Sequence, residues 1–167
     1  IISTSANGLL GIINDILDFS KIEQGKLEIE MIETDLTSEV ESIIELFYSE
    51  ALEKHINLRL FIDPFLPRCF YSDPLRIRQI LSNLISNAIK FTPKNGEINI
   101  RIKSLCNIER ECAQVYFEVR DSGIGISKEK QKHIFEAFSQ ADSTITREYG
   151  GTGLGLSISN WLVKLLG

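Results

Sequence analysis

Apolar side chains recur along the first 22 residues of the chain at the spacing of an α-helix. Three of them lie seven residues apart, and a second row runs beside them. The stripe consists of Ile2, Leu9, Leu10, Ile12, Ile13, Ile16, Leu17 and Phe19. A stripe this wide is typical of a helix in a bundle. The pattern therefore predicts a partner helix or a second chain, although packing against its own domain would also cover the stripe.

After Gly25 the helical pattern stops, and residues 26–33 alternate between polar and apolar side chains, which predicts a strand. A second helix begins next, because Asp35 or Thr37 can accept a hydrogen bond from its first turn. Residues 56–62 alternate again and predict a second strand.

A third helix has the clearest boundaries in the sequence. Asp73 is a capping residue, and Pro74 stands at the first helical position, where its missing N–H costs nothing. An apolar face continues to about Phe91, and an Asn-Gly turn follows at residues 95–96. The pattern predicts a helix over residues 74–91.

The rest of the chain predicts two antiparallel strands and two helices. Apolar residues alternate at positions 98–102 and again at 115–119, and a polar loop at 107–111 separates them. Ser127 can cap a short helix ending near Phe135, and a glycine cluster opens the last helix. This order predicts an α/β sandwich, in which helices cover one face of a mixed, mostly antiparallel sheet after a long amino-terminal helix.

Composition narrows the possible functions only a little. Hydrophobic residues make up 43% of the chain and charged residues 25%, which is typical of a domain with a real core. The net charge of -5 argues against a nucleic-acid-binding surface. No apolar run reaches the ~20 residues that a membrane span needs. The odd number of cysteines, three, predicts neither a disulfide framework nor a zinc motif.

The helix after Pro74 carries a polar stripe. Asn83 and Asn87 lie one turn apart, and Lys90 and Phe91 follow one turn later. Asparagine is a mediocre helix former, so two on one stripe suggest a function. An amide oxygen suits Mg²⁺, and a lysine suits phosphate. A solvated polar face would explain the same residues.

Two glycine-rich segments follow strands or open helices. Asp121, Gly123 and Gly125 come directly after the second antiparallel strand, where a carboxylate could accept the amino group of adenine. A strand-to-helix turn that needs glycine would also explain them. The run Gly150–Ser157 opens the last helix, and glycines before a helix expose backbone N–H groups to an anion such as phosphate.

Together these three segments resemble the N, G1 and G2 boxes of sensor histidine kinases, in order and in separation. Residues 134–138 look like the F box, residues 139–149 like the mobile ATP lid, and residues 14–23 like the end of the second dimerisation helix. The resemblance covers the whole chain and implies a Bergerat-type ATP-binding fold. It implies a dimerisation-helix segment at 1–24 and a catalytic domain at 25–167 that lacks its carboxyl-terminal strands.

The resemblance also implies a protein-histidine kinase with ATP and Mg²⁺ as cofactors. Asn87 would coordinate Mg²⁺, Asn83 would help to position the ion, Lys90 would contact phosphate, and Asp121 would bind the adenine amino group. Phe135 and Phe138 would anchor the lid. The implied nucleotide-binding positions are Asn83, Asn87, Lys90, Phe91, Asp121, Gly123, Gly125, Ile126, Phe138, Gln140, Arg147, Gly151, Thr152, Gly153, Leu154, Gly155 and Leu156.

Two alternatives remain open within this superfamily. A degenerate nucleotide-binding scaffold would keep the fold without transfer, and an ATP hydrolase would carry a glutamate base at the position of Asn83. Neither His55 nor His133 stands in the context of a phosphoacceptor, so we expect the chain to bind ATP without autophosphorylating. The resemblance implies a homodimer through the amino-terminal helix, a response regulator or receiver partner, no nucleic acid, and a cytoplasmic domain anchored to the membrane only through other segments.

Overall fold

The computed structural model describes residues 2–106, 113–138 and 152–167. The chain forms two compact units, Met31–Gly125 and Ile1–Glu30 with Ile126–Gly167. The first unit contains β1 (Ile32–Asp35), α2 (Leu36–Glu53), β2 (Asn57–Ile62), β3 (Cys69–Ser72), α3 (Pro74–Phe91), β4 (Glu97–Cys106) and β5 (Ala113–Asp121). The second unit contains α1 (Ile2–Glu23), α4 (Lys128–Gln131) and α6 (Gly155–Leu166).

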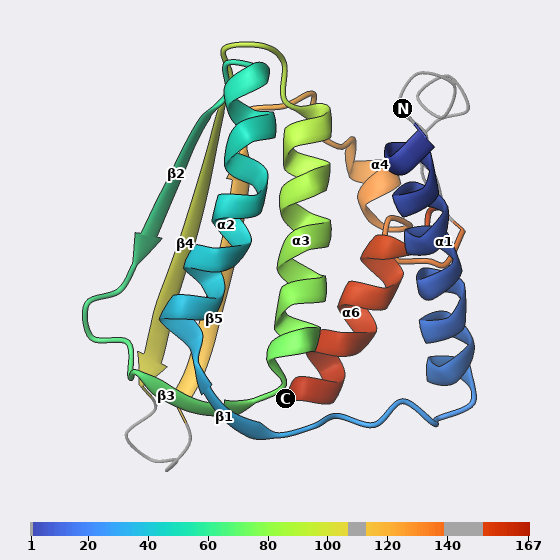
Figure 1. Ribbon diagram of the computed structural model, residues 1–167, viewed down its shortest axis with the longest axis vertical. Helices are drawn as coiled ribbons and strands as arrows, with labels where there is room; N and C mark the ends of the chain where they lie inside the picture. The colour runs from blue at the N-terminus through green and yellow to red at the C-terminus, as the bar shows by residue number, and fades with distance from the viewer. Residues whose placement is uncertain (1, 107–112, 139–151) are drawn as a thin grey trace. The chain divides into compact units, whose positions relative to one another are not determined.

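The first unit has two layers, with α2 and α3 side by side across one face of a sheet (Figure 1). The sheet has the order β2-β4-β5, in which β2 is parallel to β4 and β4 is antiparallel to β5. A separate antiparallel pair joins β1 to β3. This arrangement confirms the predicted α/β sandwich with a mixed sheet, although the three-stranded sheet has one parallel and one antiparallel pair instead of being mostly antiparallel. Its core side chains, each at most 1% exposed, include Val40, Ile43, Leu81, Ile85, Ile89, Ile98, Ile100 and Ile102.

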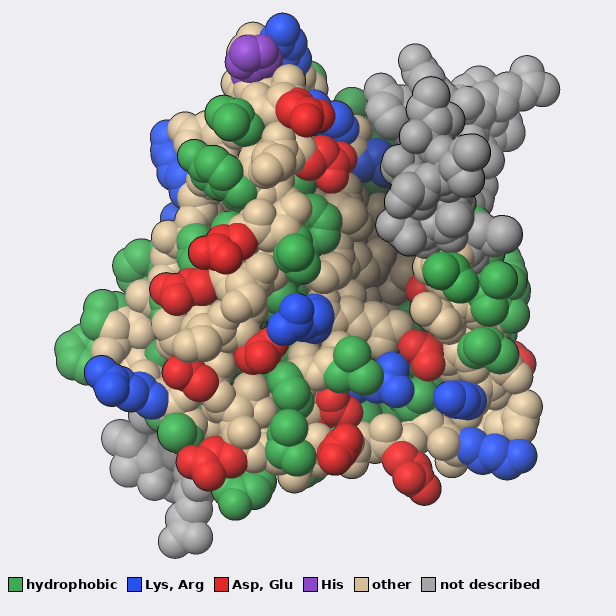
Figure 2. All heavy atoms as spheres, viewed as in Figure 1, with side chains coloured by type: hydrophobic (Ala, Val, Ile, Leu, Met, Phe, Trp, Pro, Cys, Tyr) green, Lys and Arg blue, Asp and Glu red, His purple; other side chains and the backbone are tan. Residues whose placement is uncertain are grey.

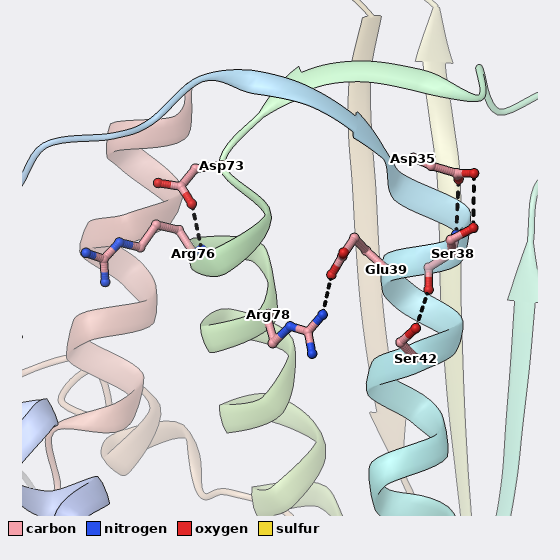
Figure 3. A network of polar contacts seen from close by, with 7 residues as sticks. All are labelled: Asp35, Ser38, Glu39, Ser42, Asp73, Arg76 and Arg78. Carbon is pink, nitrogen blue, oxygen red and sulfur yellow. Dashed lines mark hydrogen bonds and ion pairs between the residues drawn. The ribbon is translucent and has the colours of Figure 1, made fainter.

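Both long helices of this unit begin at an aspartate cap (Figure 3). A carboxylate oxygen of Asp35 accepts a hydrogen bond from the N–H of Ser38 at 3.1 Å, and Asp73 caps α3 in the same way. Such a cap satisfies one of the backbone donors that a helix start leaves without a partner. An ion pair of 2.6 Å between Arg78 and Glu39 links α3 to α2. The cap predicted at Asp35 or Thr37 is therefore at Asp35.

Two boundary predictions were wrong, and one strand was missed. The first strand was predicted at 26–33, but β1 covers Ile32–Asp35, because only those residues pair with β3. The sequence did not predict β3, which is only four residues long and too short to show alternation. The helix predicted to end near Phe135 stops at Gln131 and continues as turns. The predicted loop at 107–111 lies outside the described residues.

The second unit contains the predicted amino-terminal helix, which runs over Ile2–Glu23 and packs with α6. The side chains of Ile2 and Leu9 lie outside the described part of the chain. Hydrophobic side chains gather over α1 in Figure 2, and much of the predicted apolar stripe is exposed. Its exposed members, at 41–56%, are Leu10, Ile12, Ile13, Ile16 and Leu17. In the described residues, no helix has the length and apolar character to cross a bilayer.

Candidate nucleotide-binding site

The predicted polar stripe on α3 is present, and the side chains of Asn83, Asn87 and Lys90 are all half-buried. Nδ2 of Asn87 donates a hydrogen bond to Oδ1 of Asn83 at 3.3 Å. This bond uses a donor of Asn87 and leaves the amide oxygen of the same side chain available. That oxygen is the atom a hard cation such as Mg²⁺ would take.

Lys90 places a partly desolvated cation at the end of α3. Burial lowers the pKa of the Lys90 ammonium below its ordinary value, because desolvation disfavours the charged form. Its nitrogen lies 4.9 Å from the ring centroid of Phe91, where the face of the ring attracts a cation. A partly desolvated ammonium interacts more strongly with an anion than one in bulk water does, so Lys90 suits a phosphate ligand.

Asp121 is the last residue of β5, and the turn that follows holds its carboxylate. Oδ1 of Asp121 accepts a hydrogen bond from the N–H of Gly123 at 2.8 Å. The side chain is exposed. Since the turn occupies Oδ1, the geometry leaves Oδ2 as the oxygen that can accept a hydrogen bond from a ligand. Gly125, two residues further on, has a φ of 69°, which belongs to the left-handed region.

Gly123 brings this turn against the end of α3. A Cβ at position 123 would lie 2.6 Å from Oδ1 of Asp121 and 2.6 Å from the carbonyl oxygen of Phe91. Real Cβ contacts are never this short, so only glycine fits here without a shift. Phe91 is the last residue of α3, so this close approach ties Asp121 to the end of the helix that carries Asn87 and Lys90.

The glycine segment before α6 has a different character. Gly153 has a φ of 71°, and the hydroxyl of Thr152 accepts a hydrogen bond from the N–H of Leu154 at 3.2 Å. Leu154 stands at the cap position of α6, where no side chain caps the helix, and α6 begins at Gly155. The first turn of α6 therefore offers backbone N–H groups and the positive end of the helix dipole, as an anion site requires.

Helix α1 contacts both the F-box segment and the glycine segment of its own unit. The ring of Phe19 meets the ring of Phe138 edge-on, with centroids 5.6 Å apart. Burial, followed by the nearby charge of Asp18, raises the pKa of Asp15, and a hydrogen bond with Thr152 lowers it in part. Asp15 was not among the predicted site residues, and its only signal in the sequence is that it is an acidic residue within an apolar stripe.

Each unit carries part of the predicted set. The unit Met31–Gly125 holds Asn83, Asn87, Lys90, Phe91, Asp121, Gly123 and Gly125. The other holds Ile126, Phe138, Thr152, Gly153, Leu154, Gly155 and Leu156. Gln140, Arg147 and Gly151 lie outside the described residues. Within the described ranges, no group of three or more His, Cys, Asp or Glu side chains could hold a metal.

Comparisons with known proteins agree on one family. The model of the histidine kinase-, DNA gyrase B- and HSP90-like ATPases matches residues 72–167. The signal transduction histidine-protein kinase BarA of Escherichia coli K12 is 45% identical over 99% of this chain, and hybrid signal transduction histidine kinase L of Dictyostelium discoideum is 46% identical over 99%. The chain spans only 18% and 10% of the lengths of these two relatives.

Solved structures show the same fold. Full-length ShkA in complex with AMPPNP superposes with a TM-score of 0.79 at 32% identity, covering 96% of this chain and 32% of ShkA. Histidine kinase ThkA in complex with the response regulator protein TrrA gives 0.71 at 26% identity, covering 99% of this chain and 43% of that one. These findings confirm the resemblance inferred from the sequence boxes. The chain belongs to the family of histidine kinase-, DNA gyrase B- and HSP90-like ATPases, within which it is an ATP-binding catalytic domain of the sensor histidine kinase type.

Proposed function

We propose that this chain holds ATP with Mg²⁺ and transfers the γ-phosphoryl group to a histidine on a separate dimerisation domain. One observation carries the proposal. The same unit holds two side-chain oxygen atoms that its hydrogen bonds leave available to a ligand. The hydrogen bond between Asn83 and Asn87 leaves the Asn87 oxygen available, and the bond from Gly123 leaves Oδ2 of Asp121 available. The close approach of Gly123 to the carbonyl of Phe91 connects the turn that holds Asp121 to the end of the helix that carries Asn87.

The residues suit transfer to a protein better than hydrolysis. Asn87 would hold Mg²⁺, and Asn83 would fix the orientation of the Asn87 amide. The ion would neutralise charge on the phosphates. Lys90 would contact a phosphate oxygen. The lone pair of a histidine ring nitrogen forms the new N–P bond, and ADP departs with the electron pair of the broken P–O bond. Asn83 offers an amide rather than a carboxylate, so it supplies no base for activating water.

The nucleotide contacts divide between side chains and backbone. Asp121 would accept the adenine amino group, and the backbone at Gly123 and Gly125 would shape the pocket floor. The uncapped first turn of α6 would bind phosphate through Gly153, Gly155 and their neighbours. Gln140, Arg147 and Gly151 lie outside the described residues and remain predictions from the family motif. The solved complex of ShkA with AMPPNP supports ATP as the ligand.

We propose partners from the same reasoning. The exposed apolar face of α1 would pair with helices of a dimerisation domain in a homodimer, so residues 1–24 would belong to that domain and residues 25–167 to the catalytic one. The complex of ThkA with TrrA supports a response regulator or receiver domain as the recipient of the phosphoryl group. The domain would work in the cytoplasm, with any membrane attachment supplied by other segments of the whole protein.

A transfer assay tests the proposed function. The chain is mixed with Mg²⁺, ATP labelled on its γ-phosphate, and a separately produced dimerisation domain that carries the phosphoacceptor histidine. We expect acid-labile label on the added domain and none on the chain itself. ATP binding without transfer would indicate a scaffold, and steady phosphate release without transfer would indicate a hydrolase. Either result would contradict the proposal.

Two variants locate the metal ligand. Asn87→Ala should lower transfer by at least about tenfold, since a lost metal-ligand contact in the transition state costs more than ~1.4 kcal/mol. Asn99→Ala is the matched control, because Asn99 lies on β4 in the same unit, between buried isoleucines that face the core. Normal transfer by Asn87→Ala would show that the metal assignment is wrong.

A further inference from the structure

Ser122, between Asp121 and Gly123, makes two hydrogen bonds to one residue of the neighbouring strand. Its N–H donates to the carbonyl oxygen of Glu97 at 3.0 Å. Its hydroxyl oxygen accepts a hydrogen bond from the N–H of Glu97 at 2.9 Å. None of the family-box roles assigned above uses this side chain.

These two bonds occur where the ladder between β4 and β5 ends. The register pairs Ile98 with Asp121, so the next pair would be Glu97 with Ser122. In a continued antiparallel ladder, such a pair exchanges two backbone bonds, and the Ser122 carbonyl would accept from Glu97. Here the hydroxyl takes that place. Both backbone groups of Glu97 are satisfied, yet the chain is released from the ladder one residue early.

The early release directs the rest of the turn. Because the Ser122 carbonyl is free of the ladder, the chain can bend at Gly123, whose N–H then reaches Oδ1 of Asp121 at 2.8 Å. The same bend sets Gly123 against the carbonyl of Phe91. The carboxylate of Asp121 thus has two anchors. Its backbone lies opposite Ile98, which is fully buried, at the end of the ladder between β4 and β5, and its side chain is fixed by the turn.

The residue before Glu97 leaves room for the Ser122 hydroxyl. Gly96 precedes Glu97, and a Cβ there would lie 2.9 Å from the Ser122 hydroxyl oxygen and 2.4 Å from Cγ2 of Thr92. The Gly96 carbonyl accepts a hydrogen bond from the N–H of Asn57 at 2.9 Å, which fixes Glu97 from the side of β2. The N–H of Glu97, which donates to the Ser122 hydroxyl, is therefore held in place by the loop that follows α3.

We propose that Ser122 is a positioning residue for adenine recognition, because its hydroxyl sets the turn that aims the Asp121 carboxylate. The inference rests on the proposed role of Asp121 in binding the adenine amino group. Adenine offers an amino group to that carboxylate, whereas guanine offers a carbonyl oxygen at the same place on the ring. A turn that misplaces Asp121 therefore weakens adenine binding and leaves guanine binding unchanged.

Threonine and valine at position 122 give a matched pair, since they share a shape and differ in the hydroxyl. Affinities of the 167-residue chain for Mg-ADP and Mg-GDP are measured by titration calorimetry for the wild type, Ser122→Val and Ser122→Thr. Ser122→Val should bind ADP about three- to tenfold more weakly, the range of one lost hydrogen bond. Its affinity for GDP should not change, so the ratio of the two constants falls. Ser122→Thr should keep both values.

Thermal unfolding of the same variants separates positioning from a general structural role. Ser122 is exposed, so water can replace the lost bond, and we expect an almost unchanged melting temperature. Ser42→Ala is the control, because it removes an exposed serine hydroxyl on α2 that bonds only within its helix. An unchanged ADP-to-GDP ratio in Ser122→Val would overturn the inference, as would an equal loss for both nucleotides with a lower melting temperature. A wild-type chain without preference for ADP would overturn the role of Asp121 as well.

Discussion

The two glycine-containing segments of the proposed nucleotide site present different groups to a ligand. In the turn at 121–125, the side chain of Asp121 is the proposed ligand group, and Gly123 lets the turn lie against the carbonyl oxygen of Phe91. In the segment at 152–155, no side chain caps the helix, and Gly153 supplies a left-handed φ of 71° that leads into α6. The first segment places a carboxylate, and the second exposes backbone N–H groups.

This difference teaches that similar sequence patterns can carry opposite chemistry. A fixed carboxylate accepts hydrogen bonds and repels phosphate, so it suits the base of a nucleotide. An open helix start attracts anions of any kind, so it suits the phosphates. Recognition of adenine should therefore depend on the turn at 121–125, and affinity for phosphate should depend on the segment at 152–155.

The largest effect should come from Gly123→Ala. The added Cβ would lie 2.6 Å from a backbone oxygen of α3, which cannot move as a flexible side chain can. Displacing this turn should cost roughly 1–3 kcal/mol, which corresponds to about five- to 150-fold weaker binding of both adenosine and ADP. Titration with the two ligands checks the effect.

A second glycine provides the control for that substitution. A Cβ at Gly11, within α1, would meet nothing within 4 Å. Gly11→Ala should therefore leave nucleotide affinity unchanged and keep or raise stability, because alanine is the better helix former. Wild-type affinity for ADP in Gly123→Ala would show that the turn does not need its contact with α3.

The fold of the first unit could be predicted well where one physical signal was sufficient. Asp73 followed by Pro74 fixed the start of α3, and the predicted range 74–91 matches the observed helix. The prediction of β1 at 26–33 was wrong, because alternation shows which residues can form a strand but not which have a partner. β1 depends on β3, and a four-residue strand leaves no periodic trace.

A smaller and more selective effect is expected from Gly153→Ala. An L-residue at a φ of 71° costs roughly 1–2 kcal/mol, which would distort the start of α6. We expect about five- to 30-fold weaker binding of ADP and unchanged binding of adenosine, because only ADP has phosphates to bind there. Competition titrations with the two ligands measure both constants.

Asp121→Asn is the contrasting variant. It keeps one acceptor oxygen for the N–H of Gly123 and replaces the other with an amide donor that faces the adenine amino group. Adenosine and ADP should weaken by the same factor in this variant. If Gly153→Ala also weakens adenosine and ADP equally, the segment at 152–155 does not act on the phosphates alone.

The site was predictable where residue type determines chemistry and not where neighbours determine geometry. Two asparagines four apart on a helix predict a shared stripe, and their hydrogen bond confirms it. Nothing in the sequence shows that Gly123 faces the Phe91 carbonyl, or that the Ser122 hydroxyl replaces a ladder acceptor. The two contacts join residues 32 and 25 positions apart along the chain, and they depend on the register of β4 with β5.

The smallest effect concerns a carboxylate next to the second segment. Asp15 of α1 is half-buried and hydrogen-bonded with Thr152, and its pKa is raised mainly by burial. A raised pKa means that the folded state holds this proton more tightly than the unfolded state does. The stabilising contribution is therefore complete below the unfolded value of 3.8 and is lost as the pH rises through the folded pKa. At neutral pH, the charged carboxylate is a net cost to the folded state.

Asp15→Asn should remove that cost while keeping a side chain that can hydrogen-bond with Thr152. Because Asp15 is partly exposed, solvent screens the effect, and we expect the melting temperature at pH 7 to rise by only about 1–3 °C. The difference from the wild type should shrink as the pH falls toward 3.8, where the native carboxyl is also neutral. Glu28→Gln is the control, since it removes a charge from an exposed position of the same unit. An equal rise in both variants would trace the effect to net charge, and a rise in Asp15→Asn that persists at low pH would show that burial of the charge is not its cause.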